Sequence, residues 1–420
     1  MNNTVSLSPA PDCFTLPNGL RIVGERMDGI RSVSVGVWMG VGSLKEAASE
    51  NGLSHFLEHM VFKGTPRRTS LQLAEEMDNL GGQVNAFTGK DSTCFYARVV
   101  DDDLPQALDM LSDLTLNAIL DEEELEKERT VILEEIAMDE DEPESLLFDL
   151  IYRTVYSGTA GQTIIGPRES VSAYRREDLL AFRKKHYVPE NCVVALSGNY
   201  DFEQVKNLCM QLFGGWAPSG YAEKCPKQPA AFDNRGIMVK DTEQTHISLV
   251  YPFVLTGGED VTAGTILSTI LGASNSSRLF QRLREELGLA YSLYTAEYRV
   301  PDAGLLNIYA GVSPQNAQTT VQEMKALVEN VVKMGVTPEE VASAKRLLRT
   351  NTIFSMESTG SRMQSCARRA LYDLEPAAYE SKLREIEDCT LDEVMDAARR
   401  YLTVKPALCV IGKNAEEITL

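Results

Sequence analysis

The alternation of apolar and polar residues predicts strands in the first half of the chain. Runs rich in branched apolar residues span 14–23 and 32–39, and residues 84–100 alternate like two strands joined by a turn. A short buried strand is expected at 192–196, where the run Cys-Val-Val-Ala-Leu precedes Gly198. These segments together predict a sheet.

Helical patterns separate the predicted strands. Helical spacing of apolar residues appears at 53–62, and Thr69 can cap the helix that follows. Asp121 and Glu124 have the spacing of a capping box for a long, charged helix that ends near Pro143. Helices and strands therefore alternate along the chain.

A segment rich in proline, glycine and charge, residues 217–235, is the best candidate for a linker. When the sequence is aligned with itself so that Tyr187 falls on Tyr401, several apolar positions also coincide. The two halves therefore resemble diverged copies of one unit. We therefore expect a first half at 1–216 and a second half at 236–420. Mixed strands and helices in both halves predict the α+β class, with helices packed on one face of each mixed sheet.

The charge balance excludes several kinds of partner. The 420 residues include 41 Lys and Arg against 61 Asp and Glu, which gives a net charge of -20. A surface this acidic repels nucleic-acid phosphates and anionic lipids. We therefore expect neither nucleic acid nor a membrane as a partner. Eight dispersed cysteines without a C-x-x-C pair indicate reduced, mostly buried thiols. Because the N-terminus lacks the pattern of a targeting peptide, we expect a cytoplasmic protein.

Two of the four histidines stand in one short helical motif, H-x-x-E-H. His55 and His59 are four residues apart, so both imidazoles project from one helix face and can chelate one ion. Glu58 lies on the adjoining side of that face, where it can reach a metal-bound water without being a ligand. The alternative is a pair of structural histidines packed in a polar niche. Because histidine is rare in this chain, the pattern favours a metal site.

The third ligand of such a site is left open by the residue pattern. A hydrolytic zinc site uses three protein ligands and one open position. The helix after Asp121 supplies four candidates, which are Glu126, Glu128, Glu134 and Glu135. Glu128 and Glu135 lie two turns apart on one stripe, so either one could bind the metal while the other supports the site.

These motifs resemble the inverzincin peptidases of the M16 family, which includes pitrilysin and insulinase. The H-x-x-E-H motif is followed by the two glutamates, and the resemblance continues in the second half at 277–280 and 288–291. The shorter members, similar to the β subunit of the mitochondrial processing peptidase and its bacterial relatives, match this length best. The resemblance implies two similar α/β roll halves that close like a clamshell around a peptide.

The resemblance also implies roles for the residues of the first-half motif. By position, His55, His59 and Glu135 would bind zinc, and Glu128 would lie near the metal. Glu58 would be the general base that activates a zinc-bound water. The chain would then be a zinc-dependent endopeptidase.

Two further groups of residues would contact the substrate. The edge strand to which the substrate backbone adds would be formed by Asn85, Ala86, Phe87 and Thr88. From the second half, Arg284 and Tyr291 would reach the substrate. We expect unstructured peptides as substrates and a homodimer as the assembly. The alternatives are a non-catalytic subunit, a partner-dependent subunit of a processing-peptidase-like complex and an unrelated binding module.

Overall fold

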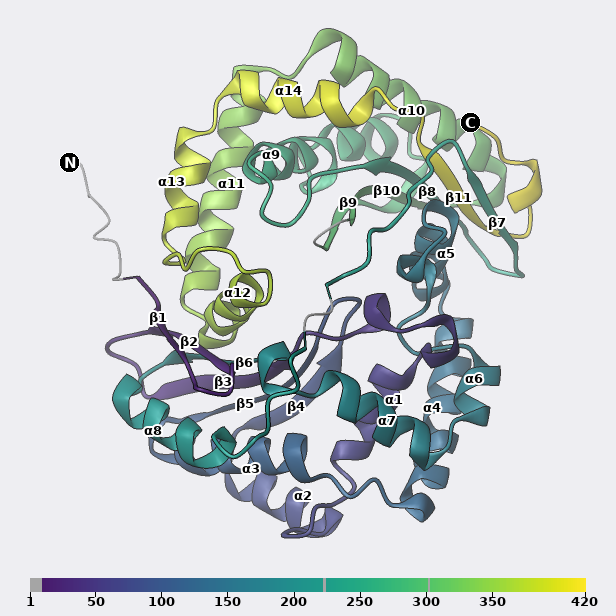
Figure 1. The fold of residues 1–420 in the computed structure, drawn as a ribbon. Coiled ribbons are helices and arrows are strands. Elements are labelled where there is room, and N and C mark those ends of the chain that lie inside the picture. Colours follow the sequence, from purple (N-terminus) through teal and green to yellow (C-terminus); the bar gives the residue numbers. More distant parts are fainter. Residues whose placement is uncertain (1–9, 222–223, 301–302) are drawn as a thin grey trace, which may run out of the picture. The chain divides into compact units, whose positions relative to one another are not determined.

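The computed structural model describes residues 10–221, 224–300 and 303–420, which fall into two compact units (Figure 1). Each unit is discontinuous in sequence. The first takes up the chain to Ile136, Thr163–Cys225 and Thr352–Lys382, and the second takes up Ala137–Gln162, Pro226–Asn351 and Leu383–Leu420. The predicted halves, 1–216 and 236–420 with a linker at 217–235, therefore differ from the compact units at two segments. Residues 137–162 of the first half belong to the second unit, and residues 352–382 of the second half belong to the first unit.

A six-stranded mixed sheet forms the centre of the first unit, with the strand order β1-β2-β6-β3-β5-β4. Its strands are β1 (Asp12–Thr15), β2 (Arg21–Arg26), β3 (Ser32–Met39), β4 (Gln83–Thr88), β5 (Thr93–Val100) and β6 (Cys192–Gly198). Its helices are α1 (Leu53–Val61), α2 (Ser70–Asn79), α3 (Leu104–Asn117), α4 (Glu122–Asp141), α6 (Arg168–Ala173), α7 (Arg176–His186), α8 (Phe202–Phe213) and α12 (Thr359–Leu371). The last residues of α4 already belong to the second unit.

The second unit has a five-stranded sheet with the order β7-β11-β8-β10-β9. Its strands are β7 (Arg235–Val239), β8 (Thr245–Pro252), β9 (Ala290–Val300), β10 (Ala303–Val312) and β11 (Ala407–Gly412). Its helices are α5 (Pro143–Val155), α9 (Val261–Gly272), α10 (Ala317–Met334), α11 (Pro338–Met356), α13 (Ser381–Asp388) and α14 (Leu391–Leu402). Both units therefore confirm the predicted α+β class. None of the helices in the described part of the chain has the length and apolar composition that crossing a bilayer requires.

The two sheets share one topology. β2 and β6 pair in parallel, as do β7 and β11, and the other strand pairs common to the two sheets are antiparallel. The offset that places Tyr187 on Tyr401 also carries β3 onto β8, β5 onto β10 and β6 onto β11. The agreement between sequence offset and strand order supports an internal repeat.

Several predicted elements agree with the structure, including β3, α1 and the pair β4 and β5. Thr69 caps α2, because its hydroxyl oxygen accepts a hydrogen bond from the Gln72 amide at 3.2 Å. The apolar run at 14–23 is not one strand, since a turn at 17–19 separates β1 from β2. Gly19 has a φ of 95°, which a residue with a side chain rarely adopts.

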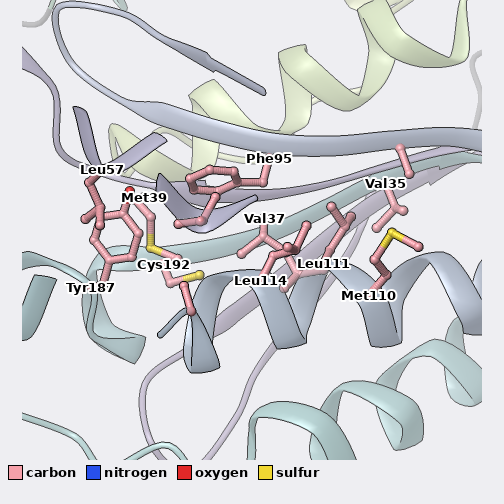
Figure 2. Close-up of a cluster of buried hydrophobic side chains, with 14 of the residues drawn as sticks. Val35, Val37, Met39, Leu57, Phe95, Met110, Leu111, Leu114, Tyr187 and Cys192 are labelled. Atoms are coloured by element: carbon pink, nitrogen blue, oxygen red, sulfur yellow. The ribbon is translucent and has the colours of Figure 1, made fainter. Parts of the chain in front are cut away.

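One face of the first sheet packs against α1 and α3. Val37 of β3 points toward Leu111 and Leu114 of α3, and Phe95 of β5 and Leu57 of α1 belong to the same buried cluster (Figure 2). All five side chains are fully buried. This apolar layer holds α1 against the sheet.

Each sheet also carries one helix on its other face, which the prediction of a single helical face did not include. α12 packs on the first sheet (Figure 1). Its residues Met363, Cys366 and Ala367 form one buried cluster with Trp38 and Val193 of the sheet. α5 packs on β7, β8 and β11 of the second sheet. The two helices belong to the exchanged segments. Both are needed because the central strands are apolar on both faces and therefore need two covering layers.

A buried ion cluster fixes α12 on the first sheet. The Arg362 guanidinium donates hydrogen bonds to Glu25 of β2 and to Glu380, each at 2.8 Å. All three side chains are buried. Burial raises the pKa of Glu25, although the Tyr379 amide and Arg362 oppose the shift. Two carboxyl groups thus share one cation.

Replacing the shared cation should destabilise the first unit. Arg362→Ala leaves two buried carboxyl groups without their counter-charge, and we expect it to lower the free energy of unfolding by about 3–5 kcal/mol. Gln364→Ala, an exposed position on the same helix, should change it by less than about 0.5 kcal/mol. Denaturant unfolding of both variants makes the comparison. Equal unfolding midpoints would show that the cluster does not hold α12.

Candidate metal centre

α1 and α4 bring three of the predicted residues together. His55 and His59 lie one turn apart on α1, with ring centroids 4.7 Å apart. Glu135 of α4 approaches both rings, with Oε1 3.6 Å from His55 Nε2 and Oε2 3.4 Å from His59 Nε2. The possible ligand atoms of the three residues all lie within 4.8 Å of one another.

The spacing and chemistry of these atoms fit zinc. Ligands bound at about 2.0–2.2 Å in a tetrahedral arrangement are about 3.4 Å apart, close to the 3.4 and 3.6 Å separations between the carboxylate and the imidazoles. Two imidazoles and one carboxylate are a ligand set of hydrolytic zinc sites, which leave one position open. The Glu135 side chain is 43% exposed, so water can reach the group. The residues therefore fit an open zinc site better than a closed structural one.

Glu128 stands on the far side of His59. Its Oε2 lies 3.1 Å from His59 Nδ1, and its Oε1 forms an ion pair with the Lys63 ammonium group. A carboxylate at Nδ1 fixes the orientation of the ring and leaves Nε2 free to face a metal. The structure thus places Glu135 among the candidate ligand atoms and Glu128 behind one of the imidazoles.

The two histidines differ in their titration. Burial, and then the nearby His59, lower the pKa of His55 to about 4. Burial would lower the pKa of His59 as well, but contacts with Glu135 and Glu128 outweigh it and raise that pKa. His55 is therefore neutral near pH 7, which is the form that binds a metal.

Glu58 lies on the adjoining side of α1, as its spacing from the histidines predicts. Its Oε2 accepts a hydrogen bond from the hydroxyl of Thr88, at the end of β4. Burial raises the pKa of Glu58, although the Thr88 hydrogen bond and His59 oppose the shift. A half-buried carboxyl group with a raised pKa suits proton transfer.

The residues predicted to bind the substrate backbone lie on β4, the outermost strand of the first sheet. Within the described strands β4 pairs only with β5, in a register that sets Asn85 opposite Tyr96. Its other edge can therefore accept an added strand. Ala86 packs toward the core that α1 shares, whereas Phe87 meets Trp38 at a centroid distance of 5.4 Å.

Glu46 is a residue of this region that sequence reasoning missed. Its buried carboxylate accepts hydrogen bonds from the amides of Ser54 at 2.7 Å and Gly52 at 2.8 Å, and from the Asn51 side chain at 3.0 Å. These amides lie at the N-terminus of α1, where N–H groups lack partners within the helix. Glu46 thus stabilises the helix that carries His55. No local signal marks it, because it precedes the helix by more residues than a capping box allows.

Arg284 and Tyr291 lie in the second unit and contact each other. The Arg284 guanidinium lies over the Tyr291 ring, 4.7 Å from its centroid, and donates to the Tyr291 carbonyl at 3.0 Å. Arg284 stands in a π-helical segment, Phe280–Glu286, and Tyr291 is 77% exposed on β9. The half-buried Arg284 and the exposed Tyr291 form one group, and their predicted contact with substrate stays a prediction.

Comparison with known families identifies the class of protein. The family described as Insulinase (Peptidase family M16) matches residues 21–168, and the family described as Peptidase M16 inactive domain matches residues 173–348. The chain belongs to the M16 peptidase family. The second description agrees with a second half that has His246 as its one histidine and lacks the H-x-x-E-H motif.

Individual relatives point the same way. A protein of Mycobacterium tuberculosis named an uncharacterized zinc protease is 38% identical over 98% of this chain and 95% of its own length. One of the same description from Bacillus subtilis is 35% identical over 96% of this chain and 98% of its own.

Solved structures show the same fold. A protease from Helicobacter pylori has a TM-score of 0.89 at 22% identity, over 97% of this chain and all of that one. A structure from Pseudomonas fluorescens described as a peptidase M16 inactive domain has a TM-score of 0.90 at 18% identity, over 98% of both chains.

Removing the Glu46 carboxylate should loosen the start of α1. Glu46→Ala leaves buried amide donors without acceptors, at a cost of about 2–4 kcal/mol in the free energy of unfolding. Thermal melting should fall, and hydrogen exchange at the Gly52 and Ser54 amides should become faster. Glu75→Ala, at an exposed site on α2, is the matched control. Unchanged exchange at these amides would contradict the assigned role.

Proposed function

We propose that this protein is a zinc-dependent endopeptidase that cleaves unstructured peptides. The observation that carries the proposal is the convergence of His55, His59 and Glu135, whose possible ligand atoms lie within 4.8 Å, beside the carboxyl group of Glu58. These three residues would hold the metal. When bound there, zinc polarises the scissile carbonyl and lowers the pKa of water toward about 7. Membership of the M16 family, and relatives named zinc proteases, support this reading.

The protein's own groups then perform the proton transfers and the positioning. Glu58 takes the proton of the attacking water and returns it to the leaving amine, a cycle that a carboxylate of raised pKa can complete. Glu128, paired with Lys63, keeps His59 in one orientation through Nδ1. The catalytic roles of Glu58 and the supporting role of Glu128 are thus distinct.

Substrate binding would use the free edge of β4. Main-chain hydrogen bonds to residues 85–88 hold an extended peptide with little dependence on its side chains. A folded protein cannot present such a strand without local unfolding, so unstructured peptides are favoured. The net charge of -20 favours basic ones. We include Arg284 and Tyr291 as substrate contacts from the second unit, and enclosure of the peptide by the two halves as part of the proposal.

The assembly and location belong to the same proposal. We propose a cytoplasmic homodimer that acts without nucleic acid or a membrane. The alternative is a non-catalytic subunit, or one that needs a partner chain in a processing-peptidase-like complex. The presence of all three candidate ligands and of Glu58 favours a catalytic chain over a non-catalytic one. Activity of the purified chain by itself would distinguish it from a partner-dependent one.

The central test combines metal content with peptide hydrolysis. The purified protein should contain zinc, cleave an unstructured basic peptide, lose this activity to a chelator and regain it with added zinc. Glu58→Gln should keep its zinc and lose at least about 100-fold in turnover, because the proton acceptor is gone. Near-normal turnover of the zinc-loaded variant would refute the role of Glu58. A wild-type protein without zinc would refute the metal site.

The two glutamates of α4 should differ in their effect on metal binding. We expect Glu135→Gln to lose zinc, because a ligand atom is replaced by a weaker one. Glu128→Gln should keep most of its zinc and reduce activity by about 10–100-fold, since it alters the support of a ligand. Metal analysis after dialysis measures the first effect and steady-state kinetics the second. If Glu128→Gln loses zinc and Glu135→Gln keeps it, the two roles must be exchanged.

A further inference from the structure

We propose that Thr88 is a positioning residue that orients the general base Glu58. The strand that takes up the substrate would then also hold the base in place. The inference rests on the proposed function, in which Glu58 accepts a proton during peptide hydrolysis.

Thr88 is the donor of the hydrogen bond between its hydroxyl and Glu58, as the partners of the neighbouring hydroxyl groups show. The hydroxyl of Thr93 lies 3.5 Å from that of Thr88 but donates its own proton to the Val41 carbonyl at 3.0 Å. The Thr88 proton is therefore available to Glu58 Oε2, and an ionised carboxylate can only accept. One oxygen of Glu58 is held by Thr88, and the other is left to take the proton.

The position of Thr88 suits this task. It is the last residue of β4, directly opposite Thr93 of β5 in the strand register. Its side chain lies on the same face of the strand as that of Ala86, two residues earlier, which packs on the core that α1 shares. The sheet therefore fixes the hydroxyl rigidly, whereas an unheld glutamate has three rotatable side-chain bonds. A base held in one geometry transfers protons more efficiently than a mobile one.

This arrangement separates two functions of β4. An added peptide strand would pair with the main-chain groups of β4, and the Thr88 hydroxyl is directed to Glu58 instead. Loss of the hydroxyl should therefore reduce turnover and leave substrate affinity nearly unchanged. A purely structural role of Thr88 would affect both, together with stability.

The test compares variants that differ in the hydroxyl donor. Thr88→Val keeps the branched shape of threonine without a donor, and Thr88→Ser keeps the donor. We expect Thr88→Val to lower kcat by about 10–100-fold, the range typical of residues that orient an active group, with KM changed less than about twofold. The zinc content of Thr88→Val should equal that of the wild-type protein, and Thr88→Ser should keep most of the wild-type activity. Thr88→Ala, which also lacks the donor, replaces Thr88→Val if that variant does not fold.

A double-mutant cycle asks whether Thr88 acts through Glu58. In single-turnover assays at high enzyme concentration, Thr88→Val should cause no further loss in the Glu58→Gln background. An equal loss in both backgrounds, or wild-type kcat in zinc-loaded Thr88→Val, would overturn the inference while leaving the peptidase proposal intact. A zinc-loaded wild-type protein that cleaves no peptide would overturn both.

Discussion

The packing of α1 against the first sheet is the constraint on which the candidate site depends. Phe56, Leu57 and Met60 on one side of this short helix are fully buried in the core. Because apolar burial fixes the rotation of the helix, His55 and His59 must face away from the core, toward α4. A rotation of α1 by one residue would turn the imidazoles into the apolar core and move apolar side chains out of it.

The exchange of helices between sequence halves shapes both units. α12, which comes from the second half of the sequence, covers the face of the first sheet that α1 and α3 leave open, and α5, from the first half, covers one face of the second sheet. Trp38 and Val193 are buried under α12 together with residues of that helix. A chain cut at the linker would leave this face without its covering helix. The metal-binding half of the sequence is thus not the same as the unit that contains the site.

Charged groups around the site are arranged in pairs that hold one another in place. Glu128 lies between Lys63 and His59, so the carboxylate is neutralised on one side and fixes an imidazole on the other. Glu46 accepts hydrogen bonds from the backbone amides of Gly52 and Ser54 and from the Asn51 side chain. In a protein of net charge -20, these local partners allow carboxylates to be buried where the site needs them.

The sequence by itself determined what depends on short-range spacing. The four-residue separation of His55 and His59 is a property of any helix, and the Thr69 cap needs only a neighbour three residues away. The internal repeat was also visible, because copies of one fold keep their apolar positions. The residue pattern left Glu135 and Glu128 open, because both lie on one helical stripe, and only the resemblance to the M16 family separated them. The tertiary structure adds what stands opposite each one: both imidazoles opposite Glu135, and the Nδ1 side of His59 together with Lys63 opposite Glu128. The contacts of Glu46 with the start of α1, of Thr88 with Glu58 and of α12 with the first sheet were likewise decided by packing, because each joins residues whose spacing in the chain carries no signal.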